Sequence, residues 1–175
     1  NGIEQVKEYI DWLVRNQQNY FEFNLLETKE VDKWLDYIEP AVKYAKSRGV
    51  LIGLDISLHM TQQKTFMLYK NFPVSLQTVK NQIAHNLETL FKVQWDLIAM
   101  ESSTTEFTKG NAKRIQELQL FITNLVVNKY GAKLAGREHV VKKENTFATL
   151  TEIAQKEIIE GWVIYHKRTA WKIRM

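Results

Sequence analysis

Two acidic residues interrupt stretches of sequence that are otherwise apolar, and they are the strongest candidates for chemistry in the chain. Asp55 follows Val-Leu-Ile-Gly-Leu at 50–54, and Glu101 follows Leu-Ile-Ala-Met at 97–100. Burial of a carboxylate in apolar surroundings costs free energy unless the group is ion-paired or hydrogen-bonded. A carboxylate at such a position therefore has either a partner or a function. Paired carboxylates perform glycoside hydrolysis, one as general acid and the other as nucleophile or base. We therefore expect Glu101 to be the acid and Asp55 or Glu106 to be its partner.

Other polar residues fall at or just after predicted strand ends, where they could contact a substrate: Glu22, Asn24, His59, Arg137, His139 and His166. The three histidines of this set could instead join Asp55 or Glu101 around a divalent metal that activates water. The sequence has neither a His-x-His pair nor a His-Glu-x-x-His motif. We therefore assign no metal ligands and no cofactor. The fourth histidine, His85, is expected in a helix as a surface or packing residue.

Three aromatic residues in predicted strands could offer flat faces to sugar rings. They are Tyr20, Trp95 and Trp162. Aromatic residues in strands more often belong to the core, because each buries a large apolar area. Both interpretations stay open at the level of the sequence.

The hydrophobic pattern alternates between the 3.6-residue period of helices and the short apolar runs that are typical of strands. Helices are predicted over residues 3–15, 31–47, 76–90, 111–125 and 146–159. Strands are predicted over residues 19–27, 50–58, 95–101, 131–136 and 162–166. Strands joined by helical crossovers are parallel. The fold class is therefore α/β, either a partial or complete (β/α) barrel or an open doubly wound sheet. In both, ligands bind beyond the carboxyl ends of the strands.

Composition narrows the classes of function. The 175 residues carry a net charge of +4 without a concentrated basic run, so we expect no nucleic-acid partner. No apolar run is long enough for a membrane span, and we expect no membrane partner. The absence of cysteine excludes disulfides, thiolate zinc sites and a cysteine nucleophile. We expect a soluble protein whose compartment the sequence leaves open, with secretion or a periplasmic location compatible with it.

Several nucleotide-binding and hydrolase motifs are absent. There is no Gly-x-Gly-x-x-Gly after a strand, no P-loop and no Gly-x-Ser-x-Gly elbow. Dinucleotide binding, P-loop nucleotide hydrolysis and serine hydrolase chemistry of the α/β-hydrolase type are therefore not expected.

Residues 10–23, 44–56 and 95–108 carry a resemblance to known proteins. These three segments resemble a group of large, uncharacterised bacterial proteins with a glycosidase-like (β/α) barrel. The last is the most specific, because its Glu-x-x-[ST]-[ST]-Glu-Phe-Thr pattern is similar to a strand-end signature of that group. The resemblance covers about residues 3–140, and it implies the fold more than an activity. Near the end of the chain, Lys167 and Arg168 stand where the group has Pro-Glu.

The sequence therefore predicts one α/β domain over residues 1–175, interpreted as a segment of a longer barrel protein. The leading hypothesis is a hydrolase of glycoside hydrolase type that acts on carbohydrate or another small polar substrate. The alternatives are a non-catalytic domain that binds carbohydrate or a protein partner, and a metal-dependent hydrolase. Five strands would leave open sheet edges. We expect either further chain segments or a second copy of the chain to cover those edges.

Overall fold

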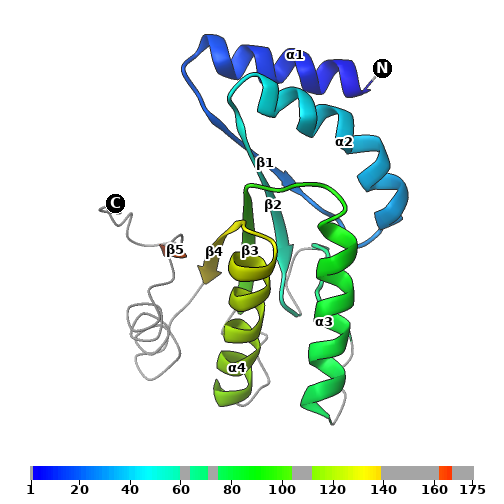
Figure 1. Ribbon diagram of the computed structural model, residues 1–175, viewed down its shortest axis with the longest axis vertical. Coiled ribbons are helices and arrows are strands. Elements are labelled where there is room, and N and C mark those ends of the chain that lie inside the picture. Colours follow the sequence, from blue (N-terminus) through cyan, green and yellow to red (C-terminus); the bar gives the residue numbers. More distant parts are fainter. Residues whose placement is uncertain (1, 60–63, 71–74, 104–111, 139–161, 167–175) are drawn as a thin grey trace.

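The computed structural model describes residues 2–59, 64–70, 75–103, 112–138 and 162–166, in which helices and strands alternate (Figure 1). The helices are α1 (Gly2–Arg15), α2 (Val31–Ser47), α3 (Leu76–Leu90) and α4 (Ala112–Thr123), which continues into the π-helical segment η1 (Asn124–Lys129). The strands are β1 (Tyr20–Asn24), β2 (Leu51–Ser57), β3 (Leu97–Ser103), β4 (Lys133–Glu138) and β5 (Trp162–His166). The helix predicted over residues 146–159 lies outside the described residues.

The five strands form one parallel sheet in the order β1-β2-β3-β4-β5. The predicted α/β class with parallel strands is confirmed. A doubly wound sheet requires a point at which the strand order reverses. The order here never reverses, so the doubly wound alternative is wrong for the described strands. Right-handed crossovers that always step in the same direction place their helices on one face of the sheet. Figure 1 shows α2, α3 and α4 on the same side.

The hydrophobic core lies between these helices and the sheet. From β2 it receives Ile52, Leu54 and Ile56, all fully buried. From the helices it receives residues spaced by three or four positions, which share one helical face. Those of α3 and α4 are Val79, Ile83, Leu87, Leu90, Leu118 and Ile122. The core therefore fixes one face of the sheet against the helices, and the alternate residues of each strand point to the opposite face.

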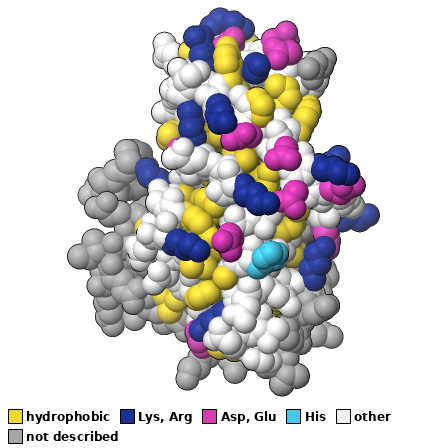
Figure 2. Space-filling model, turned by 45° about the vertical axis from the view of Figure 1, so that its right-hand side comes forward, with side chains coloured by type: hydrophobic (Ala, Val, Ile, Leu, Met, Phe, Trp, Pro, Cys, Tyr) yellow, Lys and Arg dark blue, Asp and Glu magenta, His cyan; other side chains and the backbone are white. Residues whose placement is uncertain are grey.

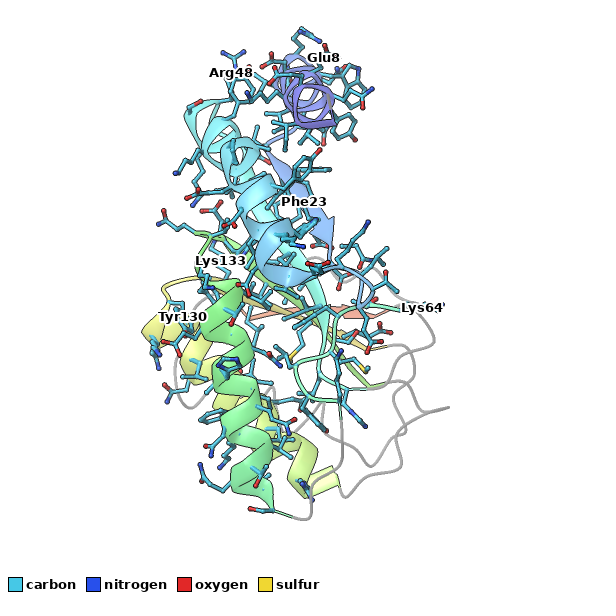
Figure 3. All side chains as sticks on the ribbon, turned by 90° about the vertical axis from the view of Figure 1, so that its right-hand side faces the viewer. Glu8, Phe23, Arg48, Lys64, Tyr130 and Lys133 are labelled. Carbon is cyan, nitrogen blue, oxygen red and sulfur yellow. The ribbon has the colours of Figure 1, made fainter. Side chains whose placement is uncertain are left out.

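The amino-terminal ends of the strands are joined by the side chain of Asp96, which precedes β3. Asp96 Oδ2 accepts a hydrogen bond from the Ile52 N–H at 2.8 Å, and Asp96 Oδ1 lies 3.2 Å from Lys46 Nζ of α2. Its backbone oxygen also accepts the N–H of Lys133 at the start of β4. Figure 3 shows Lys133 at this end of the sheet. Asp96 was not among the residues predicted to have a role, and its contacts are structural.

Trp95 belongs to the core and does not offer a face to a sugar. Its side chain is buried, and its indole Nε1–H donates a hydrogen bond to the Leu90 oxygen at 2.8 Å. Its ring stacks on Trp34 of α2 with 6.0 Å between centroids, and Phe23 of β1 meets both rings edge-on. Figure 3 shows Phe23 between β1 and α2. The core interpretation is therefore correct for Trp95, while the side chain of Trp162 is not described.

The helical surface carries side chains of both charges. Figure 2 shows Lys and Arg side chains interspersed with Asp and Glu on the face that it presents. His85 of α3 is exposed, in agreement with the expectation for this histidine. None of the described helices combines the length and apolar character needed to cross a bilayer.

Candidate functional site

The candidate site lies at the carboxyl ends of β2 and β3, on the sheet face opposite the helices. Register pairs Asn24 with Asp55, Ser57 with Glu101, and Glu101 with Arg137. Side chains of neighbouring strands at paired positions point to the same face of a sheet. Asp55, Ser57 and Glu101 therefore share one face, because Asp55 and Ser57 are two residues apart.

Asp55 and Glu101 are both almost fully buried, with 5% and 4% of their surfaces exposed. They lie on adjacent strands and are offset by two residues in register. Strands about 4.8 Å apart with a rise of about 3.3 Å per residue place the two Cα atoms roughly 8 Å apart. Level with Asp55 on the same face, Asp55 pairs with Ala99 of β3, and Ala99 pairs with Ala135 of β4. Two small side chains therefore lie beside Asp55 toward β4.

Residues 64–69 form a loop that runs along the carboxyl ends of β1 and β2. The Phe66 N–H donates to the Leu25 oxygen at 2.7 Å, and the Ser57 N–H donates to the Phe66 oxygen at 2.8 Å. The Leu68 N–H then donates to the Ser57 oxygen at 2.8 Å. The loop thus lies between the end of β1 and the end of β2, next to the candidate site. Figure 3 shows Lys64 of this loop on the side of the sheet away from α3.

The loop forms hydrogen bonds with the backbone of Ser57 and not with its side chain. Ser57 is fully buried, and its Oγ has no hydrogen-bond partner within the part of the chain that the structure describes. Ser57 faces Glu101 across the register, so its hydroxyl belongs to the same cluster as the two carboxylates. It was absent from the candidate substrate-binding residues, although its position after Asp55 could have indicated it.

His59 follows β2 and binds the loop. Its ring stacks on Tyr69 with 4.5 Å between centroids, and Nδ1 lies 3.0 Å from the Tyr69 backbone oxygen. A carbonyl oxygen can only accept, so Nδ1 carries the proton and Nε2 is the acceptor in the neutral ring. Burial lowers the pKa of His59, and the Tyr69 carbonyl opposes this shift. Burial also raises the pKa of Tyr69 to about 12, against the influence of Arg114.

Glu22 and Asn24 of β1 lie on the same sheet face as Asp55 but are more exposed than it is. The Tyr20 hydroxyl donates a hydrogen bond to Glu22 Oε2. The Tyr20 ring lies over Gly53, where a Cβ would collide with the phenol oxygen. Glycine at position 53 therefore allows Tyr20 to cover β2. Of the three aromatic candidates for sugar stacking, Tyr20 is the one with an exposed, described ring, at 37%.

The remaining predicted site residues are described in part or not at all. Arg137 is the register partner of Glu101, and His166 pairs with Glu138 one position further along β4. Their side chains are not described. Glu106 and His139 lie outside the described residues, so their assignments remain predictions. Among the residues that the structure describes, no three His, Asp or Glu side chains gather around a point that could hold a metal ion.

Comparison with known proteins supports the fold. No protein-family profile matches the sequence, and no curated protein is similar to it. Among solved structures, the chain resembles a β-arabinopyranosidase, with 16% identity and a TM-score of 0.51 over 77% of this chain. It also resembles CpGH84B, a GH84 glycoside hydrolase, with 16% identity and a TM-score of 0.55 over 87% of this chain.

The chain spans 19% of the β-arabinopyranosidase and 28% of CpGH84B. At these identities the likeness establishes a fold and not an activity. The chain therefore has a glycosidase-like α/β fold, in partial agreement with the resemblance seen in the sequence.

Proposed function

We propose that this chain carries part of the active site of a glycoside hydrolase. The observation that carries the proposal is the placement of Asp55 and Glu101 on one face of adjacent strands, at their carboxyl ends, with both side chains buried. Active sites of (β/α) barrels are built at that end of the strands. A Cα separation of roughly 8 Å allows carboxyl groups at the distances that glycosidases use, about 5–10 Å.

In this proposal Glu101 protonates the glycosidic oxygen as the bond from that oxygen to the anomeric carbon breaks. Asp55 either attacks the anomeric carbon or removes a proton from the water that does so. The net reaction adds one water across the bond, its proton going to the leaving oxygen and its hydroxide to the anomeric carbon. Asn24, Glu22 and Tyr20 extend the polar face along β1, where they would contact the sugar. His59 would hold the loop over residues 64–69 in place.

The test is hydrolysis of a panel of 4-nitrophenyl glycosides and polysaccharides by the full-length protein. We expect Glu101→Gln and Asp55→Asn to lose at least about 100-fold in activity, as for removal of a general acid or base. The matched control is Glu88→Gln on the exposed face of α3, which should retain activity. Melting temperatures of both site variants should stay close to that of the wild type or rise, because functional groups are often not optimal for stability.

A loss of several kcal/mol in either site variant would mark a structural carboxylate and exclude it from catalysis. Loss of wild-type activity on addition of a chelator would instead favour the metal-dependent hydrolase. Full activity of Glu101→Gln would reject the carboxylate mechanism.

One observation favours a second candidate, a domain that binds carbohydrate or a protein partner without catalysis. The loop over residues 64–69 is hydrogen-bonded along the carboxyl ends of β1 and β2, close to the carboxylates. A strand end closed by its own loop has less room for a reacting substrate. Under this alternative, glycans would bind with similar affinity to the wild type and to Glu101→Gln, and neither protein would hydrolyse them.

A further inference from the structure

The side chain of Ser57 places a buried hydroxyl beside the two carboxylates of the proposed active site. Ser57 is fully buried, and its Oγ has no hydrogen-bond partner within the described segments of the chain. Its main chain is fixed, because its N–H donates to the Phe66 oxygen and its oxygen accepts the Leu68 N–H. A buried polar group without a partner costs free energy, so its presence requires a reason such as a catalytic role.

Three side chains lie next to Ser57 on the sheet face opposite the helices. Glu101 pairs with Ser57 on β3, and Met67 of the loop over residues 64–69 pairs with it on the other side. Asp55 lies two residues before Ser57 on β2 and points to the same face. Ser57 is therefore the direct neighbour of Glu101 across the sheet and of Asp55 along the strand.

The spacing between Asp55 and Ser57 suits one water molecule held between their side chains. Two residues of a strand span about 6.6 Å, and their side chains stand roughly perpendicular to the sheet. This separation is too long for a direct hydrogen bond. Two hydrogen bonds of about 2.8 Å that meet at one water oxygen span up to about 5.6 Å. The longer Asp55 side chain can lean toward Ser57 over the remaining distance.

We infer that Ser57 and Asp55 hold the water that attacks the anomeric carbon, so that hydrolysis proceeds with inversion. The inference rests on the proposed function and selects the role of general base for Asp55. Asp55 accepts one proton of the water as the water oxygen bonds to the anomeric carbon. The bond from that carbon to the leaving oxygen breaks, and Glu101 gives its proton to the leaving oxygen. Ser57 Oγ accepts a hydrogen bond from the second hydrogen of the water, which directs a lone pair of the water toward the sugar.

The offset between the two carboxylates agrees with this role. Inverting glycosidases keep their carboxyl groups about 6.5–9.5 Å apart to leave room for the water, whereas retaining glycosidases keep them about 5–5.5 Å apart. Asp55 and Glu101 are offset by two residues on adjacent strands, with Cα atoms roughly 8 Å apart. The residue of β3 directly beside Asp55 is Ala99, whose small side chain leaves space for the water.

The first experiment is proton NMR of the sugar released by the full-length wild-type protein from a glycoside of known anomeric configuration. We expect the sugar first released to have the opposite configuration from the substrate. Retention would overturn the inference and leave the proposed function standing, with Asp55 as the nucleophile. Absence of hydrolysis by the folded protein, over the whole panel of glycosides and polysaccharides, would overturn both.

Ser57→Ala tests the hydroxyl itself, and Ser47→Ala at the exposed end of α2 is the matched control. We expect Ser57→Ala to lose about 10–100-fold in kcat with little change in KM, because a misplaced water slows the attack more than it weakens sugar binding. Its melting temperature should stay within about 4 °C of the wild type, since no described group loses a hydrogen-bond partner. Ser47→Ala should keep the wild-type kcat.

Two results with Ser57→Ala would overturn the inference. A wild-type kcat would show that the hydroxyl has no part in the reaction. A raised KM with an unchanged kcat would assign the hydroxyl to sugar binding. If Ser57→Ala does not fold, the anomeric configuration produced by the wild type decides the inference without a variant.

Discussion

His59 connects the loop over residues 64–69 to the end of β2 through its ring, whose pKa is lowered by burial. Its Nδ1 proton lies against the Tyr69 carbonyl, and its ring stacks on the Tyr69 phenol. Burial is the main cause that lowers the pKa of His59 below its ordinary value near 6.5. Protonation is therefore easier in the unfolded chain than in the folded one. The stabilisation from neutral His59 is present above that ordinary value and is lost as the pH falls toward the folded pKa.

We predict that the free energy of unfolding falls from pH 7.5 to pH 5 more steeply in the wild type than in His59→Gln. Glutamine cannot titrate, so the difference between the two slopes isolates the histidine. Urea denaturation at a series of pH values measures it, and His85→Gln on the exposed face of α3 serves as the control. Parallel slopes for His59→Gln and the wild type would show that the pKa of His59 is unchanged by folding.

The sequence predicted the two carboxylates of the candidate site. It did not predict Ser57 or the loop over residues 64–69, whose positions depend on contacts between residues distant in sequence. Asp55 and Glu101 were identifiable because each interrupts an apolar run, and register brings them to one face. Ser57 was missed as a site residue because a serine carries no burial signal of its own. The loop over residues 64–69 was also missed. Thr65, Phe66 and Tyr69 have high strand propensity, but their partners are distant in sequence, and propensity alone does not identify them.

The elements were predictable wherever one face is continuously apolar. Helix α2 has the predicted bounds, and α3 begins and ends where its apolar period does. The first strand is shorter than predicted, because the Leu25 oxygen accepts the Phe66 N–H and Leu26 pairs with Thr65 of the loop. Helix α4 continues further than its predicted end through the π-helical segment to Lys129. The sequence period extends over Leu118, Ile122 and Val126, but periodicity does not specify how the last turn is hydrogen-bonded.

The buried side chains of α3 and α4 should contribute strongly to the stability of the fold. Ile83, Leu87 and Ile122 are fully buried between the helices and the sheet. Truncation of each to Ala should cost about 2–5 kcal/mol, from lost burial and from the cavity that remains. Chemical denaturation measures this cost. The exposed Asn81→Ala on α3 is the control, with an expected change within about 0.5 kcal/mol. Neutral substitutions at the three core positions would show that the helices do not pack in this phase.

The whole molecule should not unfold as a single rigid unit, because its elements are attached to very different degrees. Strands β2 and β3 each have a neighbour on both sides, and Ile52, Leu54, Ile98 and Met100 are fully buried. Helix α1 lies at one end of the sheet and contacts α2 and Phe21. Opening of α1 would therefore expose much less surface than separation of β2 from β3. Amides in weakly attached elements exchange through partial openings, and those in the core exchange through global unfolding.

We predict that the amides of β2 and β3 exchange at the free energy of global unfolding. Those of α1 should exchange at a lower free energy, with a weaker dependence on denaturant, because less surface is exposed. Native-state hydrogen exchange at low denaturant resolves the two groups. Exchange of α1 at the same free energy as β2 and β3 would show that α1 opens only when the whole fold unfolds.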